Sequence, residues 1–139
     1  MPQLIIMRGM PGSGKSTRAR EIIEVGLCGP GFKATIRSTD DQFMVNGKYT
    51  FNPKMLGVNH ARNLQLVEKD MKDGIPCIIV DNTNIKRRDF AAYLALATKY
   101  GYTSREEVMT EWDVDVCFNR NTHNVPREAI QRMHDNFEA

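Results

Sequence analysis

The segment Gly9–Ser16 constrains the fold more than any other stretch of this 139-residue chain. Its letters, GMPGSGKS, fit the pattern G-x-x-x-x-G-K-[ST] without a mismatch. The segment follows an apolar run at residues 3–7, which is predicted to be a strand, and precedes a helix predicted to begin near Lys15. Glycines let successive backbone N–H groups point into one concavity, and a helix N-terminus favours an anion there. The sequence therefore predicts a phosphate-binding loop.

The residues of this loop are typical of a nucleoside triphosphate site that uses Mg²⁺. Lys15 is suited to reach the β- and γ-phosphates, and the hydroxyl of Ser16 is suited to ligate the metal. A glycine-rich turn with a solvated lysine is the alternative interpretation. The residues expected to bind the nucleotide are Gly12, Ser13, Gly14, Lys15, Ser16 and Thr17. Such a loop indicates a binding site but does not by itself indicate a reaction.

Apolar segments alternate with segments of helical periodicity along the chain, a pattern typical of an α/β fold with a mostly parallel sheet. Strands are predicted at residues 3–7, 34–37, 75–80 and 108–112. Helices are predicted at residues 15–26, 53–74, 87–100, 114–120 and 126–137. The length fits a single domain over residues 1–139.

The composition excludes several classes of protein. Hydrophobic residues make up 41% and charged residues 26% of the chain, as in globular rather than disordered or fibrous proteins. A net charge of +2 does not by itself indicate a polyanion partner. The apolar runs are far shorter than the ~20 residues of a membrane-spanning helix. No basic segment precedes the first apolar run, so we expect neither a signal peptide nor a membrane partner.

The cysteines indicate the expected redox compartment. Cys28, Cys77 and Cys117 form no C-x-x-C pair, and an odd number does not fit a disulfide framework. Cys77 lies in an apolar run, where a small buried side chain is expected. We therefore expect reduced thiols and a cytoplasmic location.

Acidic residues follow two predicted strands at the edge where a parallel sheet binds its ligands. Asp40 and Asp41 follow the second strand, and Asp81 follows the third. Asp40 is the candidate that orients an acceptor hydroxyl, because a carboxylate can receive its proton late in a loose phosphoryl-transfer transition state. Asp81 suits a water-mediated contact to Mg²⁺. Either cluster could instead cap the helix that follows it.

Charge that develops on a transferred phosphoryl group also requires a cation. Residues 119–123 lie between the fourth predicted strand and the last helix, where a lid is expected. Arg120 is the first candidate for this cation and Arg127 is the second. The alternative for each is a solvated surface arginine.

Three aromatic residues follow Asp40 and are candidates for contact with an acceptor. Phe43, Tyr49 and Phe51 flank a predicted turn at residues 46–47. A ring beside the acid could stack on a nucleobase, which contributes about 1–3 kcal/mol per base in single-strand binders. The alternative is that these rings pack the loop against the protein.

Polar residues elsewhere complete the predicted acceptor side. Asn82 and Asn84 can hydrogen-bond the loop or an acceptor without adding charge. Arg87 begins a helix, where a positive charge opposes the dipole, so it indicates either a phosphate contact or a solvated first turn. His60 and Asn63 either point toward the acceptor or form a buried hydrogen-bonded pair. The acceptor-side candidates are Asp41, Phe43, Asn82, Asn84 and Arg87.

Four strings in this order give the chain a family resemblance: MRGMPGSGKSTRAR, STDD, IIVDNTN and RNxHxVPREAIxRM. Together they resemble the branch of P-loop kinases that contains the kinase module of bacteriophage polynucleotide kinase and related predicted kinases. The resemblance covers residues 3–137. It implies an adenylate-kinase-like P-loop NTPase fold with a four-stranded parallel sheet, helices on both faces and a small helical lid.

The resemblance also implies ATP with Mg²⁺, and transfer of the γ-phosphate to a 5′-hydroxyl of DNA or RNA. By position, Lys15 and Ser16 match the family's phosphate and metal residues, Asp40 matches its general base, and Arg120 falls in its lid. The chain departs from the phage enzyme at two acceptor-side positions. Phe43 replaces an arginine, and Asn82 replaces an aspartate.

Three functions therefore remain open from the sequence. The first is a polynucleotide 5′-hydroxyl kinase, and the second is a kinase of a nucleoside, nucleotide or other small metabolite. The third is a non-catalytic NTP-binding switch, which has little need for a carboxylate at position 40.

Overall fold

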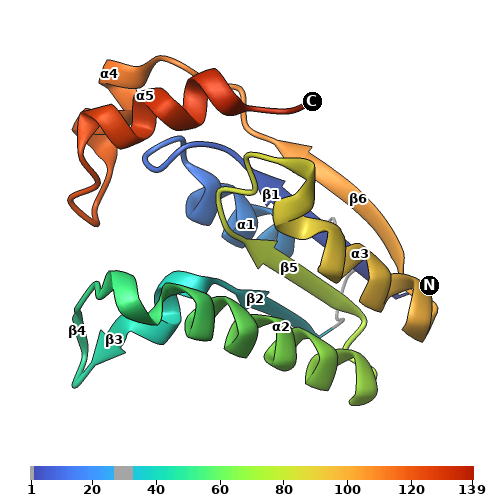
Figure 1. The fold of residues 1–139 in the computed structure, drawn as a ribbon. Coiled ribbons are helices and arrows are strands. Elements are labelled where there is room, and N and C mark those ends of the chain that lie inside the picture. The colour runs from blue at the N-terminus through green and yellow to red at the C-terminus, as the bar shows by residue number, and fades with distance from the viewer. Residues whose placement is uncertain (1, 27–32) are drawn as a thin grey trace.

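The computed structural model describes residues 2–26 and 33–139, which form a four-stranded parallel sheet in the order β2–β5–β1–β6 with helices around it (Figure 1). The strands of this sheet are β1 (Gln3–Arg8), β2 (Ala34–Arg37), β5 (Cys77–Asp81) and β6 (Thr103–Val108). The helices are α1 (Lys15–Glu24), α2 (Leu56–Lys72), α3 (Arg87–Tyr100), α4 (Val114–Arg120) and α5 (Arg127–Asn136). Short 3-10 turns η1 (Thr39–Phe43) and η2 (Pro53–Met55) flank a small antiparallel hairpin, β3 (Met44–Val45) and β4 (Lys48–Tyr49).

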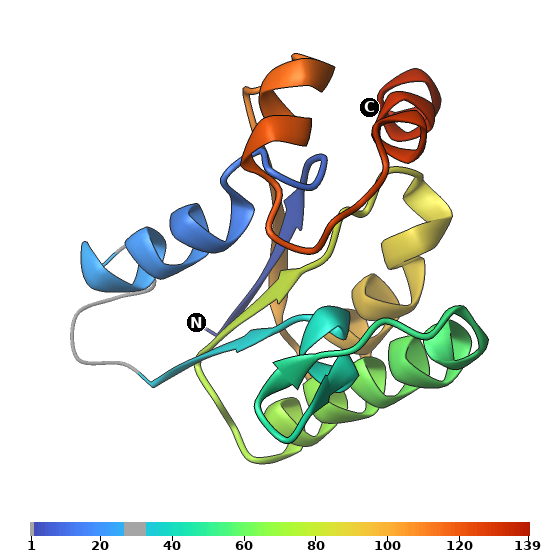
Figure 2. The same cartoon turned by 90° about the vertical axis from the view of Figure 1, so that its left-hand side faces the viewer.

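Helices cover both faces of the sheet, as the sequence predicted. Figure 2 shows α1 on one side and α2 and α3 on the other. Along β1, Leu4 and Ile6 pack into the core under α2 and α3, whereas Ile5 and Met7 pack against α1. Because successive side chains of a strand point to opposite faces, a strand covered on both sides must be apolar throughout. Each fully buried aliphatic side chain contributes roughly 1.5–3 kcal/mol of transfer free energy.

The fourth strand lies earlier in the chain than predicted. It is β6 (Thr103–Val108), paired in parallel with β1, and the expectation of a strand at residues 108–112 is wrong. Five of the six residues of β6 are exposed, so an edge strand here carries no apolar alternation. Its charged side chains instead pair with neighbours: Glu107 contacts Arg18 at 2.8 Å and Arg105 at 2.9 Å.

Helices α4 and α5 form the predicted lid, with a small apolar core of its own. Val114, Cys117 and Ile130 pack together with Met10, which belongs to the phosphate-binding loop and is fully buried. The Trp112 ring also lies 4.5 Å from that of Phe137 at the end of α5. The lid is therefore packed directly on the loop.

Arg8, the fully buried last residue of β1, connects β6 to the segment that follows α5. Its guanidinium bonds Glu106 at 2.9 Å and the carbonyl oxygens of Asn84 and Ile85 at 2.8 and 3.1 Å. It also donates to the carbonyl of Glu138 and lies 4.5 Å from the ring centroid of Phe137. A buried charge is tolerated only when it is paired and hydrogen-bonded, and Arg8 meets this condition.

The cysteine expectation is wrong at one position. Cys77 is fully buried in β5, as expected, but it is disulfide-bonded, whereas Cys117 is a free buried thiol. Cys28 lies outside the described residues.

Of the helices in the described part of the chain, none has both the length and the apolarity needed to cross a bilayer.

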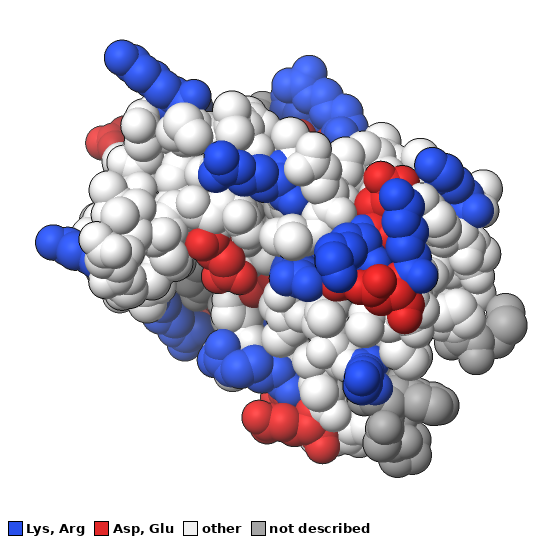
Figure 3. Space-filling model, turned by 90° about the horizontal axis from the view of Figure 1, so that it is seen from below, with Lys and Arg blue, Asp and Glu red and all other residues white. Residues whose placement is uncertain are grey.

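Charged side chains on the face below α2 are of both signs. Figure 3 shows blue and red side chains interleaved across a largely uncharged surface. Exposed ion pairs of the chain include Lys69 with Asp73 at 2.6 Å and Lys99 with Glu68 at 3.3 Å. Exposed pairs of this kind contribute little to stability.

Candidate active site

The phosphate-binding loop connects β1 to α1 with a backbone that requires glycine. Gly12 and Gly14 have φ of +80° and +94°, and Gly14 is the N-cap of α1. A Cβ atom on Gly12 would lie 2.0 Å from the carbonyl oxygen of Cys117 and 2.9 Å from the backbone nitrogen of Asn121. Both the left-handed conformation and the approach of α4 therefore exclude a larger residue at position 12.

Lys15 lies on this loop with its amine close to two carboxylates. Its Nζ donates to the carbonyl of Met10 at 3.1 Å. Burial lowers the pKa of Lys15, and the negative charges of Asp81 and Asp40 oppose this effect. The structure thus brings together the predicted phosphate-binding lysine and both predicted acids.

Ser16 and Asp81 join the start of α1 to the end of β5. The Ser16 hydroxyl donates to Oδ2 of Asp81 at 2.7 Å, and Asp81 is only 6% exposed. Hydroxyl and carboxylate oxygens are the hard ligands that Mg²⁺ prefers, and the ion commonly keeps waters between itself and a carboxylate. The side chains at this point fit the predicted metal site.

The short turn η1 holds Asp40 at the end of β2 through its neighbours. The backbone N–H of Thr39 donates to Oδ1 of Asn82 at 2.8 Å, and the Thr39 hydroxyl hydrogen-bonds Nδ1 of His60 at 2.9 Å. The Ser38 hydroxyl accepts from the Asp40 N–H at 3.2 Å, which caps the turn. Asn82 therefore positions the segment that carries Asp40. Sequence reasoning missed Thr39, whose only signal was its place in the STDD string.

The side chain of Asp40 is half exposed and contacts two rings. Tyr49 donates from its hydroxyl to Oδ1 at 3.4 Å, and Nε2 of His123 lies 3.7 Å from Oδ2. Burial and the Asp40 charge help raise the pKa of Tyr49 to about 12. Burial, together with Asp81 and Asp40, also raises the pKa of Asp41. The charges of Asp40 and Asp81 thus act on both Lys15 and Asp41.

Three of the predicted acceptor-side residues make contacts within the protein. Phe43 is 2% exposed, with its ring 5.0 Å from that of Phe51, so it packs the segment of residues 43–51 together. Asn84 is buried with φ +48° and donates from its side chain to the Met7 carbonyl at 2.8 Å. Arg87 pairs with Glu106 at 3.0 Å and lies 5.0 Å from the Phe90 ring.

The two lid arginines differ in their surroundings. Arg120, at the end of α4, is 63% exposed and lies 3.7 Å from Glu111. Burial raises the pKa of the Cys117 thiol, and the charges of Lys15 and Arg120 oppose this effect. Arg127 pairs with Asp115 at 2.7 Å on the lid itself.

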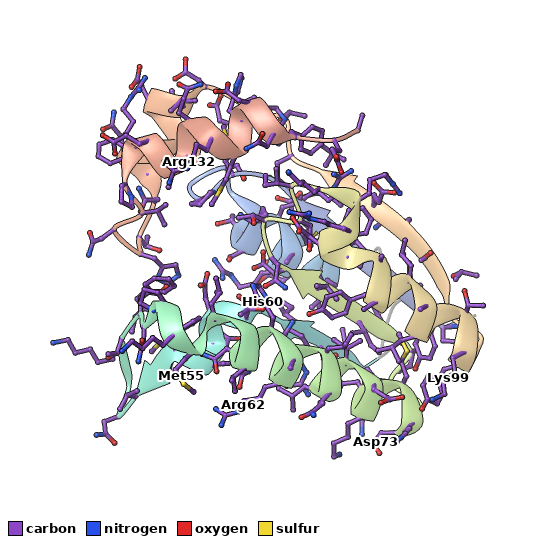
Figure 4. All side chains as sticks on the ribbon, viewed as in Figure 1. Met55, His60, Arg62, Asp73, Lys99 and Arg132 are labelled. Carbon is purple, nitrogen blue, oxygen red and sulfur yellow. The ribbon has the colours of Figure 1, made fainter. Side chains whose placement is uncertain are left out.

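A cavity of about 380 Å³ lies between α2 and α3 and is lined in part by residues 82–84, which directly follow β5. Figure 4 shows His60 on the side of α2 that faces the lid and Arg62 on the opposite side. His60 and Asn63 do not pair with each other, because Asn63 donates to the Tyr93 hydroxyl at 2.9 Å. No lysine or arginine is among the described residues lining the cavity, which are His60, Ala61, Leu64, Asn82, Thr83, Asn84, Asp89, Ala92 and Tyr93.

Comparison with known families identifies the chain. Residues 4–139 match the family described as an AAA domain. The chain belongs to this family. Human NEDD4-binding protein 2 is 37% identical to this AAA domain over 138 residues, which are 97% of the chain but 8% of the relative. Human YLP motif-containing protein 1 is 29% identical over 159 residues, and the chain spans 7% of its length.

Solved structures of kinases have the same fold as this AAA domain. A chain of the Pnkp1/Rnl/Hen1 RNA repair complex superposes with a TM-score of 0.74 at 22% identity, covering 97% of this chain and 43% of that one. The APS kinase CysC of Mycobacterium tuberculosis, in complex with AMPPNP and APS, gives a TM-score of 0.57 at 18% identity over 86% of this chain and 68% of that one. The chain therefore has the α/β fold of P-loop kinases.

Proposed function

We propose that residues 1–139 form one ATP-dependent kinase domain, which moves the γ-phosphate of ATP to a hydroxyl acceptor, most specifically the 5′-hydroxyl of DNA or RNA. One observation carries this proposal: Lys15 lies within electrostatic reach of both Asp81 and Asp40, but only Asp81 is bonded to the loop. One acid is thus committed to the metal side, and the other is available to an acceptor.

The chain's own groups would bind the nucleotide from two sides. The loop N–H groups and Lys15 would hold the phosphates, and Ser16, with Asp81 through water, would hold Mg²⁺. When bound, Mg²⁺ would offset the charge on the phosphate oxygens. Arg120, an exposed residue at the end of α4, would supply a further positive charge from the lid.

Asp40 would act on the acceptor. The hydroxyl oxygen forms a bond to the γ-phosphorus while the bond from that phosphorus to the β,γ-bridging oxygen breaks, and its electron pair leaves with ADP. The hydroxyl proton passes to a carboxylate oxygen of Asp40 late in the reaction, so the acid mainly aligns the nucleophile. Asn82 supports this alignment because it holds the adjacent Thr39 N–H.

A nucleic-acid acceptor is supported by the likeness to a chain of an RNA repair complex. The cavity between α2 and α3 is compatible with the terminal nucleoside of such an acceptor, which carries no 5′-phosphate. The same cavity, which has no lysine or arginine among its described lining residues, also favours a second candidate, a kinase of a nucleoside or another small alcohol without a phosphate. A non-catalytic nucleotide switch would leave the carboxylate of Asp40 without a purpose.

Transfer of labelled phosphate from ATP tests the proposal. Substrates should include DNA and RNA oligonucleotides with a 5′-hydroxyl, the same oligonucleotides with a 5′-phosphate as matched controls, nucleosides and simple alcohols. We expect label on the 5′-hydroxyl oligonucleotides and none on their phosphorylated controls. Label on nucleosides alone would favour the second candidate. ATP binding without transfer to any acceptor would contradict the kinase proposal.

A further inference from the structure

The connection between α4 and α5 reaches across the site to the hairpin β3–β4. Figure 1 shows this connection descending from the lid toward the hairpin. His123 lies on it, and its ring centroid is 4.0 Å from that of Tyr49 on β4, with the planes inclined by 34°. Such a separation is that of a packed aromatic pair. The lid therefore touches the acceptor side of the molecule as well as the phosphate-binding loop.

These two rings are the groups that contact the carboxylate of Asp40. Its Oδ1 accepts from the Tyr49 hydroxyl at 3.4 Å, and its Oδ2 lies 3.7 Å from Nε2 of His123. The backbone of η1 is held from elsewhere, by Asn82 and His60 through Thr39. The direction of the half-exposed carboxylate consequently depends on the hairpin and the lid.

The two contacts are longer than a close hydrogen bond, which needs about 2.6–3.2 Å between heavy atoms. Catalytic hydrogen bonds are often long in the unliganded protein and tighten when the substrate complex forms. A small movement of the lid toward the hairpin would shorten the distance from His123 to Asp40.

His123 also affects the charge of this region. Burial and the charges of Asp81 and Asp40 raise the pKa of Asp41, and Arg37 and His123 act against them. Arg37 is already bonded to Asp70 at 2.7 and 2.8 Å. The electrostatic surroundings of Asp41 therefore include a residue of the α4–α5 connection as well as one of β2.

One ring nitrogen of His123 is still unused. Its Nδ1 is buried and has no hydrogen-bond partner in the part of the chain that the structure describes. Buried polar atoms without a partner are uncommon, and each calls for a water or a ligand.

We propose that Tyr49 and His123 are positioning residues that form a bridge between hairpin and lid and aim the carboxylate of Asp40 at the acceptor hydroxyl. The inference rests on the proposed function, because it assigns a purpose to the carboxylate that receives the proton. It links lid closure to acceptor alignment: the acid is aimed only while the α4–α5 connection lies on the hairpin.

Three variants separate the parts of the bridge. His123→Phe keeps a ring against Tyr49 but removes the nitrogen near Asp40, and Tyr49→Phe keeps the ring but removes the hydroxyl. His123→Ala removes both contacts of the lid. His134→Phe is the matched control, because His134 is an exposed histidine of α5 that pairs with Asp135. Melting curves should first establish that all four variants fold.

Steady-state transfer to the acceptor that the wild type labels best is then measured. We expect kcat to fall about 10-fold to 100-fold in His123→Phe and Tyr49→Phe, with the KM for ATP unchanged. The reason is that a carboxylate pointing in the wrong direction slows phosphate transfer but does not weaken nucleotide binding. In His123→Ala, kcat should fall by at least as much, and in His134→Phe it should equal the kcat of the wild type. In an Asp40→Asn background, His123→Phe should cause little further loss, since its effect acts through the acid.

The outcomes separate the two proposals. Normal kcat in His123→Phe and Tyr49→Phe, in a wild type that transfers phosphate, would overturn the bridge and leave the kinase proposal standing. Equal losses with and without the Asp40 carboxylate would also overturn it, because the rings would then act independently of the acid. A wild type that labels no acceptor would overturn the proposed function and the positioning role together.

Discussion

The hydroxyl of Ser16 donates a 2.7 Å hydrogen bond to Oδ2 of Asp81, and this contact joins the first turn of α1 to the end of β5. The two residues are far apart in the chain, but parallel strands bring their carboxyl ends to one edge of the sheet. The contact keeps a hydroxyl and a carboxylate oriented toward one point before any metal binds.

Metal dependence should therefore change when this pair is broken. We expect Asp81→Asn to raise the Mg²⁺ concentration needed for half-maximal phosphate transfer by about 10-fold or more, because residues that orient a metal's ligands commonly have effects of 10–100-fold. A magnesium titration of the transfer rate measures this. Asp73→Asn, on the exposed end of α2, is the control and should leave the titration unchanged. If the dependence of the transfer rate on Mg²⁺ concentration is unaltered in Asp81→Asn, Asp81 does not help to bind the metal.

Replacement of Asp40 by Asn should separate chemistry from binding. Asn keeps the size of the side chain but cannot take the proton, so we expect transfer to fall about 10²–10⁴-fold while ATP affinity is retained. Calorimetry of ATP binding and labelled transfer give the two readouts. Asp41→Asn, a change of the same kind at the next position, should lower the rate of transfer less than Asp40→Asn does. Loss of ATP affinity equal to the loss of rate would argue against the role in aligning the acceptor.

Gly12→Ala should damage both nucleotide binding and the seating of the lid. The added Cβ combines a φ of +80° with a 2.0 Å approach to the Cys117 carbonyl. Gly74 has a φ of +73° but nothing within 4 Å of such a Cβ, so Gly74→Ala reports the conformational cost alone, about 1–2 kcal/mol. Urea unfolding should show a larger loss for Gly12→Ala, and only this variant should lose ATP binding. Equal losses of unfolding free energy in the two variants would mean that α4 moves away from the added Cβ atom without a cost in stability.

The stability of the protein should depend on the ionisation of Glu106. Hydrogen bonds from Arg87 and Arg8 hold the pKa of Glu106 below its ordinary value of 4.5. A carboxylate with a lowered folded-state pKa stabilises the protein above the unfolded-state pKa, and this contribution is lost as the pH falls through the folded-state pKa.

Glu106→Gln should therefore be less stable than the wild type at pH 7, and the difference should shrink as the pH falls below 4.5. Urea unfolding at a series of pH values measures it. Glu24→Gln, on the exposed end of α1, is the control and should show a flat difference. If the difference in unfolding free energy between Glu106→Gln and the wild type does not change with pH, the ion pairs of Glu106 with Arg8 and Arg87 do not stabilise the protein.

The loop and the central strands could be predicted because their signals are local. A glycine pattern specifies Gly9–Ser16, and burial on both faces makes β1 and β5 continuous apolar runs. The edge strand β6 could not be found this way, because its side chains are exposed and polar. Its partners lie on other elements, so its register is not visible in its own sequence.

The partners of several side chains could not be predicted for a related reason. A phosphate contact stayed open for Arg87 because its partner Glu106 lies on β6, an exposed strand without an apolar pattern. For Phe43, packing and acceptor contact both stayed open, and the structure shows packing against the rings of Tyr49 and Phe51. His123 stood in a recognisable string, but its contact with Asp40 joins segments from opposite ends of the chain. Pairings at such range need the folded structure.

Met10 is buried in the apolar core of the lid although it belongs to the phosphate-binding loop. The lid thus cannot swing away as a detached flap without exposing this side chain to water. Motion of the lid should instead be a rocking about a pivot at Met10, small at the triphosphate end and amplified at the far tip where His123 sits. The apolar contact thereby couples any displacement of the lid to the shape of the phosphate-binding loop.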